Sequence, residues 1–585
     1  MYSRRKFIKQ GSMLLAGSTI MPSIANDALG VHSVERSVNS NDRLFFDAFT
    51  RIGTRRYKHP AEQWRLEDLI DELKHCSVSG ALVSYTLSVI YDAMYSNLEL
   101  SNMLKPYPHL FAIWNVLPHH TGECLPPKAL GESMREHDVR AVTITPLSYG
   151  WDWRTSASNE LLQWLSDNQI LVITTAAELG GWTAVNDFLS KYKTLPLLLT
   201  GTNWIEQRYL LPLVATFSNL HISFDRFQIK EGLESLYKKG CIDQLIFASD
   251  APAMSVGAHR CYVDYAGIPE DARAKVAGGN LIRLLKGQRP PAVYTNNDED
   301  RLMSAARQGK PLPIPVVDMH MHTIHEGLNG GGGAGYRMEN GGPKGCFPLM
   351  KKLGYVGGGF MSWTGPASCD SLGGNIQVKE TLDVAPQGYW GLLTFDPVHY
   401  TQKQLETMIP QAYAADKRFI GMKPYFFFGV EYHHPSYDVW WEYGDKHKLY
   451  ALIHPSREDL LEVETLAPRY PNVRWVIAHA AGSYAMADMA IAAMKKNSNV
   501  YAEITLTPVP LGILEYMVEQ VGEDRILYGS DLPMRDPRQQ MGWVVYSRLP
   551  LAVKEKILST NALNVIKPCM DRLPKYNIPE HFLNK

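Results

Sequence analysis

The chain has 585 residues, with 59 lysines and arginines against 60 aspartates and glutamates, and 45% of it is hydrophobic. This is the composition of an ordinary globular protein, and a net charge of −1 gives no electrostatic reason to expect a nucleic-acid partner. The seven cysteines include no CxxC pair, which excludes a disulfide scaffold and a thiolate zinc site.

The N-terminus resembles an export signal. Residues 2–9 read YSRRKFIK and precede an apolar stretch at 13–21 and small residues up to Ala25. We therefore expect residues 1–25 to be a twin-arginine-like signal peptide and the protein to be exported to the periplasm. No later run approaches about 18 apolar residues, so no membrane contact is expected in the mature form.

The rest of the chain contains an internal repeat. DQLIFASDAP at 243–252 and DRILYGSDLP at 524–533 place Asp250 and Asp531 at positions that differ by 281. The same offset relates three further pairs in the segments that follow: Pro269 and Pro550, Lys275 and Lys556, Asn280 and Asn561. The repeat predicts a first domain at 40–288, a polar linker at 289–313 with one short helix, a second domain at 314–570 and a tail at 571–585.

Each copy shows eight short apolar runs separated by amphipathic segments. In the first copy they lie near 44–49, 80–85, 110–116, 139–145, 170–176, 196–200, 219–224 and 243–249. In the second copy they lie at 314–320, 354–362, 389–396, 418–424, 448–454, 473–479, 499–504 and 526–530. Runs without polar alternation are typical of parallel strands covered on both faces. The fold class is therefore α/β, as two tandem (β/α)₈ barrels of the TIM type.

Polar residues at the strand ends of the second copy form a candidate metal site. His320 and His322 are two residues apart on one strand, so their side chains point to the same side. His454, His479 and Asp531 end the fifth, sixth and eighth strands. Each has a simpler interpretation alone, such as Asp531 capping the next helix, but a barrel gathers its strand ends at one mouth. Four imidazoles and a carboxylate there would suit Zn²⁺ or a similar ion.

This set resembles the amidohydrolase superfamily. HxH after strand 1, His after strand 5, HxxG after strand 6 and GSDxP at strand 8 are similar to the amidohydrolase-related branch, which includes aminocarboxymuconate-semialdehyde decarboxylase and several lactonases. The resemblance implies that His320, His322, His454 and Asp531 ligate one divalent metal, Zn²⁺ or alternatively Mn²⁺. It also implies that His479 is catalytic and that Asp531 moves a proton.

Three further residues are candidates for substrate binding: Lys423, Arg337 and Trp363. Some relatives carry a carboxylated lysine and a second metal at strand 4, where Lys423 lies, but we expect a substrate-facing cation. The alternative is a lysine that snorkels to solvent or forms a salt bridge. Arg337 belongs to a glycine-rich loop at 327–346, and an aromatic loop at 424–441 could wall a pocket. For both loops, a surface or packing role is the alternative.

The first copy lacks the imidazoles. At the corresponding positions it has Phe49, Arg51, Ala176 and Thr200, and only Asp250 remains. We expect this copy to be catalytically silent and to act as a built-in partner in an intramolecular pseudo-dimer, with a homo-oligomer as a further option.

The sequence thus favours a metal-dependent hydrolase that cleaves a lactone or related cyclic ester or amide of a small polar acid. The substrate would be anionic or sugar-derived. One alternative is a metal-dependent, non-oxidative decarboxylase of an unsaturated or aromatic carboxylic acid. The other is an inactive protein that binds a metal or a carbohydrate.

Overall fold

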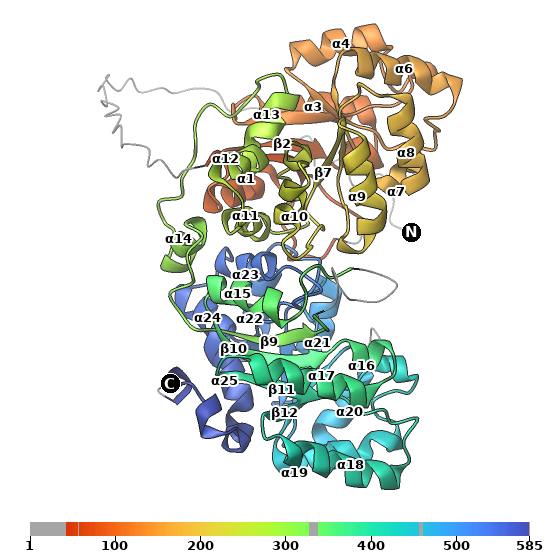
Figure 1. Ribbon diagram of the computed structural model, residues 1–585. Coiled ribbons are helices and arrows are strands. Elements are labelled where there is room, and N and C mark those ends of the chain that lie inside the picture. Colours follow the sequence, from red (N-terminus) through yellow and green to blue (C-terminus); the bar gives the residue numbers. More distant parts are fainter. Residues whose placement is uncertain (1–42, 57, 327–336, 456–459, 584–585) are drawn as a thin grey trace, which may run out of the picture. The chain divides into compact units, whose positions relative to one another are not determined.

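The computed structural model describes residues 43–56, 58–326, 337–455 and 460–583 (Figure 1). The predicted signal at 1–25 and the first half of the glycine-rich loop, 327–336, lie outside these ranges. Within the described part of the chain, no helix is both long enough and apolar enough to cross a membrane. The two predicted barrels are confirmed, because the described residues form two eight-stranded sheets whose strands follow one another in chain order.

All strand pairs within both sheets are parallel. The first sheet consists of β1 (Phe46–Ile52), β2 (Gly80–Tyr85), β3 (Leu110–Asn115), β4 (Ala141–Thr143), β5 (Leu171–Thr174), β6 (Leu197–Leu199), β7 (Leu220–Ser223) and β8 (Leu245–Ile246). The second consists of β9 (Val316–Thr323), β10 (Tyr355–Ser362), β11 (Tyr389–Leu393), β12 (Phe419–Met422), β13 (Tyr450–Ile453), β14 (Arg474–Ile477), β15 (Val500–Glu503) and β16 (Ile526–Leu527).

Backbone hydrogen bonds beside the first and last strands close each sheet into a barrel. The Ala48 amide donates to the Phe247 carbonyl over 2.9 Å, and the Met319 amide donates to the Tyr528 carbonyl over 3.0 Å. Every residue of β9 is buried, as expected of a strand covered on both faces. This strand runs to Thr323, beyond the predicted end at 320, so both histidines of the HxH motif lie within it.

Helices connect the strands. The first barrel has α1 (Leu66–His75), α2 (Leu87–Ile90), α3 (Ala93–Leu104), α4 (Pro127–Glu136), α5 (Pro146–Tyr149), α6 (Ser156–Asp167), α7 (Ala176–Leu179), α8 (Trp182–Lys191), α9 (Gln207–Thr216), α10 (Gly232–Lys238), α11 (Val256–Asp264), α12 (Glu270–Ala274) and α13 (Asn280–Leu284). After the linker helix α14 (Arg301–Arg307), the second has α15 (Pro343–Leu353), α16 (Thr364–Ala367), α17 (Ser371–Val384), α18 (Gln402–Ala415), α19 (Asp438–His447), α20 (Leu461–Arg469), α21 (Tyr484–Lys496), α22 (Ile513–Val521), α23 (Pro537–Val545), α24 (Leu551–Glu555) and α25 (Asn561–Ile566), and α26 (Glu580–Leu583) lies near the C-terminus.

The two barrels share small details that support a tandem duplication. In the first, Asp47 Oδ1 accepts hydrogen bonds from the amides of Phe49 (3.1 Å) and Ser249 (3.0 Å). In the second, Asp318 accepts from the amides of His320 (2.9 Å) and Ser530 (3.2 Å) in the same way. A π-helical turn also interrupts both final helical segments, at Lys275–Gly279 and Lys556–Thr560.

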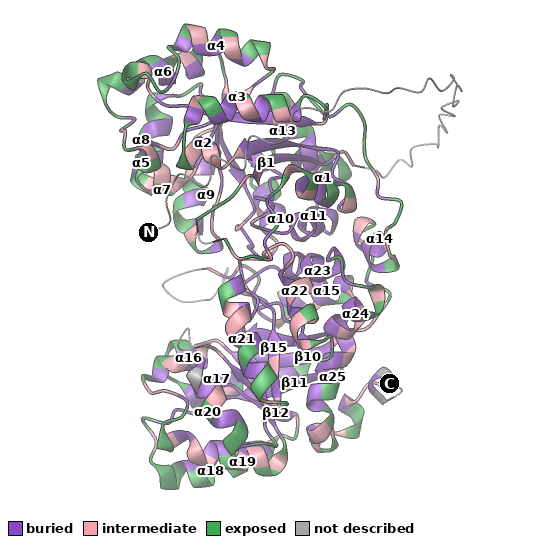
Figure 2. Cartoon of the chain, turned by 180° about the vertical axis from the view of Figure 1, so that it is seen from behind, coloured by how far each residue is buried: buried purple, intermediate pink, exposed green. Residues whose placement is uncertain are grey.

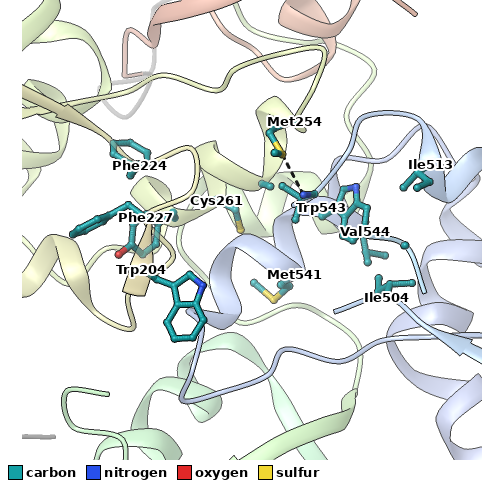
Figure 3. Close-up of a cluster of buried hydrophobic side chains, with 14 of the residues drawn as sticks. Trp204, Phe224, Phe227, Met254, Cys261, Ile504, Ile513, Met541, Trp543 and Val544 are labelled. Atoms are coloured by element: carbon teal, nitrogen blue, oxygen red, sulfur yellow. Dashed lines mark hydrogen bonds between the residues drawn. The ribbon is translucent and has the colours of Figure 1, made fainter. Parts of the chain in front are cut away.

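Helices α11 and α23 join the barrels, and every residue of both is buried (Figure 2). They can approach closely because a glycine on each faces the other: a Cβ on Gly542 would collide with Cys261, and one on Gly257 would collide with Tyr546. Figure 3 shows the side chains around this crossing, which include Trp204, Phe224, Phe227, Met254 and Cys261 of the first barrel and Ile504, Ile513, Met541, Trp543 and Val544 of the second. The linker helix α14 contacts both α11 and α23, so the polar linker also contributes to this core.

Candidate metal centre

Three of the predicted ligands converge at the mouth of the second barrel. His320 Nε2 lies 3.5 Å and His322 Nε2 3.0 Å from Asp531 Oδ1. All three side chains are buried, and Asp531 Oδ1 has no hydrogen-bond donor among the described residues. A buried carboxylate oxygen that faces two ring nitrogens without a donor is the arrangement that a metal ion would satisfy.

Glu503, the last residue of β15, orients His320. Its Oε2 accepts a hydrogen bond from His320 Nδ1 over 2.9 Å, while the Thr505 amide donates to Oε1 over 2.6 Å. Because Nδ1 carries the proton, Nε2 presents its lone pair toward Asp531. Burial also lowers the pKa of His320 well below its usual value, which keeps the ring in the neutral form that binds metals. The residues present therefore fit a divalent ion.

His454 and His479 lie side by side next to this group. Their ring centroids are 4.8 Å apart, and that of His479 is 5.0 Å from the ring of His320. His454 Nδ1 bonds to the Pro455 carbonyl at 3.1 Å, which leaves Nε2 available as a ligand. Burial lowers the pKa of His454 to about 3. Among the described residues, two groups of side chains at this centre are close enough to share one ion: His320, His322 and Asp531, and His320, His479 and Glu503. His454 belongs to neither group, so its role as a ligand stays a prediction.

The tautomer of His479 is fixed by the backbone. Its Nδ1 lies 2.7 Å from the Thr505 carbonyl, which can only accept, so Nδ1 carries the proton and Nε2 the lone pair. The residue has a φ of 62° in the left-handed region, and its amide donates to Glu503 over 3.3 Å. His479 is thus a neutral base held rigidly beside the candidate ligands.

Lys423 follows β12 and is fully buried. Its Nζ has no hydrogen-bond partner among the described residues, and it lies 5.5 Å from the centre of the Tyr425 ring. Burial lowers the pKa of Lys423 to about 7. Lys423 forms no ion pair with a described residue, although the salt-bridged alternative requires one. The carboxylate of an anionic substrate would supply the missing partner.

Arg535 connects the centre with the first barrel. Its guanidinium forms an ion pair with Asp531 Oδ2, and its Nε donates to Thr507 Oγ1 over 2.7 Å. The guanidinium carbon lies 5.1 Å from the ring centre of Trp204, a residue of the first barrel. A side chain of the first barrel therefore covers the arginine that pairs with a candidate metal ligand.

Aromatic side chains form one wall of the centre. The ring of Trp363 meets that of His322 edge to face at 5.6 Å, and the rings of Tyr425 and Phe426 lie 5.5 and 5.0 Å from His454. The predicted aromatic loop ends before residue 441. From Asp438 the chain is helical, in α19. Trp440 and Trp441 of this helix are buried in the core, where they pack against each other and against Trp475.

Arg337 is the third residue that was predicted to bind substrate, besides Lys423 and Trp363. Its guanidinium pairs with Glu339 at 3.0 Å, and its carbonyl accepts a hydrogen bond from Gln207 of the first barrel over 3.1 Å. These contacts belong to the junction between the barrels. A role of Arg337 in substrate binding stays a prediction.

Two important residues were missed from the sequence. Glu503 ends the apolar run VYAE, and a carboxylate at the end of a buried strand is itself a signal of function. Arg535 lies four residues after Asp531, and nothing in the sequence distinguishes it from the other arginines of the chain.

The first barrel lacks the site, but two of its equivalent residues differ from the prediction. The Thr200 amide bonds to the carbonyl of Thr174, the last residue of β5, as the Ala478 amide bonds to that of Ile453 at the end of β13. The counterparts of His454 and His479 are therefore Thr175 and Gly201, one residue away from Ala176 and Thr200. The copies differ by loop insertions, so the offset between them varies along the chain and the sequence alone misplaces each of these residues by one position.

Comparison with known proteins agrees with this geometry. The model of the Amidohydrolase family matches residues 317–567. The second barrel is an amidohydrolase domain. No curated protein matches the chain.

Three solved structures illustrate what the chain is similar to. The 5-carboxyvanillate decarboxylase from Sphingomonas paucimobilis is 12% identical over 42% of this chain and 99% of its own, with a TM-score of 0.32. The 2,6-dihydroxybenzoate decarboxylase from Rhizobium is 14% identical over 43% and 99%, with a TM-score of 0.34. A dihydroxybenzoic acid decarboxylase from Polaromonas, with bound manganese and an inhibitor, is 15% identical over 43% and 97%, with a TM-score of 0.33.

Proposed function

We propose that the amidohydrolase barrel hydrolyses a small cyclic ester, with a lactone of an anionic or sugar-derived acid as the substrate class. The observation that carries this proposal is the tautomer of His479, whose Nδ1 is tied to the Thr505 carbonyl. Hydrolysis needs a group that removes a proton from water, and the unprotonated Nε2 of a neutral, immobile imidazole can do so.

The other residues have distinct roles in this scheme. A divalent ion, when bound, would supply Lewis acidity and activate water at neutral pH. His320, His322, His454 and Asp531 would hold it, with Glu503 fixing the orientation of His320. Zn²⁺ is our first choice and Mn²⁺ the alternative. Lys423 would bind the anionic end of the substrate, and the ring of Trp363 would exclude water from one side.

Decarboxylation of a small carboxylic acid is the second candidate, and Lys423 is the observation that favours it. Its buried and unpaired Nζ could bind a substrate carboxylate, or deliver a proton to the carbon from which carbon dioxide leaves. The hydrolase proposal predicts that Lys423 only binds, whereas a decarboxylase would need it as a proton donor.

One set of assays separates the candidates. The chelator-treated full chain, reloaded with Zn²⁺ or Mn²⁺, is tested on lactones such as gluconolactone with a pH indicator, and on hydroxybenzoates with detection of carbon dioxide. We expect acid release from a lactone, its loss on chelation, and its loss in His320→Ala but not in His120→Ala, which alters an exposed histidine of the first barrel. Release of carbon dioxide without lactone cleavage would reject the hydrolase proposal. Less than about 0.2 equivalent of tightly bound metal, with no activity restored, would favour a binding protein.

A further inference from the structure

The mouth of the first barrel contains a cavity of about 400 Å³, although the metal ligands are gone. It lies at the carboxyl ends of the strands, and its wall includes Phe49, Arg51 and Thr175, which stand where His320, His322 and His454 stand in the second barrel. A TIM barrel places its binding site at this end. The volume is within the range of pockets that bind small molecules.

Smaller side chains at three of the positions equivalent to the metal centre contribute to this space. The Thr86 amide bonds to the carbonyl of Ile52, the last residue of β1, as the Trp363 amide bonds to that of Thr323 at the end of β9. Thr86 thus replaces the indole that walls the metal centre. Thr175 and Gly201 replace two imidazoles. The substitutions remove volume from the mouth and leave hydroxyl groups on its wall.

Positive charge gathers at this cavity. Arg51 is paired with Asp250 at 2.7 Å, Arg55 is tied to Glu62, and Arg56 is exposed at the rim. All three arginines line the cavity, against one acidic lining residue, Glu178. The buried Nε of Arg51 has no acceptor among the described residues. Because Arg51 and Arg55 already have carboxylate partners, the donors left for a ligand are the buried Nε of Arg51 and the exposed guanidinium of Arg56.

The rest of the wall is suited to an organic ligand rather than to an inorganic ion. Thr143, Thr145 and Thr200 contribute to it, and Ile144 and Ile173 form apolar surface between them. Guanidinium groups match the planar geometry of a carboxylate, hydroxyl side chains match substrate hydroxyls, and aliphatic side chains cover a carbon frame.

We propose that the mouth of the first barrel binds a small hydroxylated carboxylate without a metal. This site is separate from the amidohydrolase centre, and its existence does not depend on the activity of the second barrel. It gives the silent copy a binding role of its own.

The test uses the full chain carrying His320→Ala and treated with a chelator, so that the metal centre of the second barrel cannot account for binding. Isothermal titration calorimetry is performed with gluconate, with 3,4-dihydroxybenzoate, and with sorbitol as an uncharged polyol. We expect at least one acid to bind with a Kd below about 1 mM and sorbitol not to bind.

Two variants and one control locate the site. Thr86→Trp, which restores the bulk found in the other barrel, should abolish binding, and Arg56→Gln should weaken it by about tenfold. Arg289→Gln, an exposed arginine of the linker, should leave it unchanged. If the Thr86→Trp variant does not fold, the affinity of the Arg56→Gln variant for the acid still tests the proposal. The proposal fails if neither acid binds with a Kd below about 1 mM, or if binding survives unchanged in both cavity variants.

Discussion

Replacing Glu503 by glutamine tests whether this buried carboxylate fixes the tautomer of His320. Three donors point at it: His320 Nδ1, the His479 amide and the Thr505 amide. A glutamine has nearly the same shape but only one oxygen, so its amide nitrogen must face one of these donors. When the glutamine oxygen keeps the bond from the Thr505 amide, the amide nitrogen replaces Oε2 and faces both His320 Nδ1 and the His479 amide. Moving the His320 proton to Nε2 relieves the clash with the imidazole, and it removes the lone pair that a metal needs.

The expected cost follows from the role of such supporting hydrogen bonds. Losing one lowers metal affinity by about 10- to 100-fold, which corresponds to about 1.4–2.8 kcal/mol. Competition with a chelator of known affinity measures the metal Kd directly. The matched control is Glu72→Gln, which changes another buried glutamate whose pKa burial likewise raises to about 7, in α1 of the first barrel. If Glu503→Gln binds metal as tightly as Glu72→Gln does, the proposed orientation of His320 is wrong.

Three further changes probe other parts of the molecule. His479→Asn should lower kcat by about 10²- to 10⁴-fold while metal content, measured by mass spectrometry, stays constant; loss of the metal instead would make His479 a ligand. Gly542→Leu should destabilise the chain by about 1–3 kcal/mol in urea unfolding because the side chain collides with Cys261, and an unchanged midpoint would contradict the close crossing of α11 and α23. Burial lowers the pKa of His221 to about 3, so it stays neutral in the folded protein while the unfolded chain takes up a proton below about pH 6.5. Stability should therefore fall from pH 6.5 toward pH 3, by up to about 1.4 kcal/mol per pH unit for this group, and His221→Phe should reduce that slope in pH-dependent unfolding.

The fold could be predicted from sequence because its signals are local and repeated. Parallel strands covered on both faces appear as short apolar runs, and all sixteen runs coincide with strands. The ends of the strands were predicted less accurately. The prediction ended the first strand of the second copy at 320, whereas β9 continues through His322 to Thr323. The polar residues at the end of this strand are buried at the barrel mouth, whereas their polar composition predicts a loop.

The site was only partly predictable because its supporting contacts are not local. Glu503 and His320 are 183 positions apart and meet only when the barrel closes. The contact of Arg535 with Trp204 depends on how the two copies pack, which no strand pattern specifies. A sequence shows which residue types end the strands, but not which second residue holds each of them in place.

The chemistry of the lost site also explains how the first barrel can remain folded without a metal. A buried aspartate left at Asp250 without a counter-ion would be strongly destabilising. Arg51, at the position of His322, places a guanidinium 2.7 Å from that carboxylate, so a fixed side-chain cation neutralises it. The arginine at this position thus gives the carboxylate a partner that requires no metal. Its mouth is then free to hold a different ligand, while the buried Trp204 of this barrel covers Arg535, which pairs with the candidate ligand Asp531 of the other barrel.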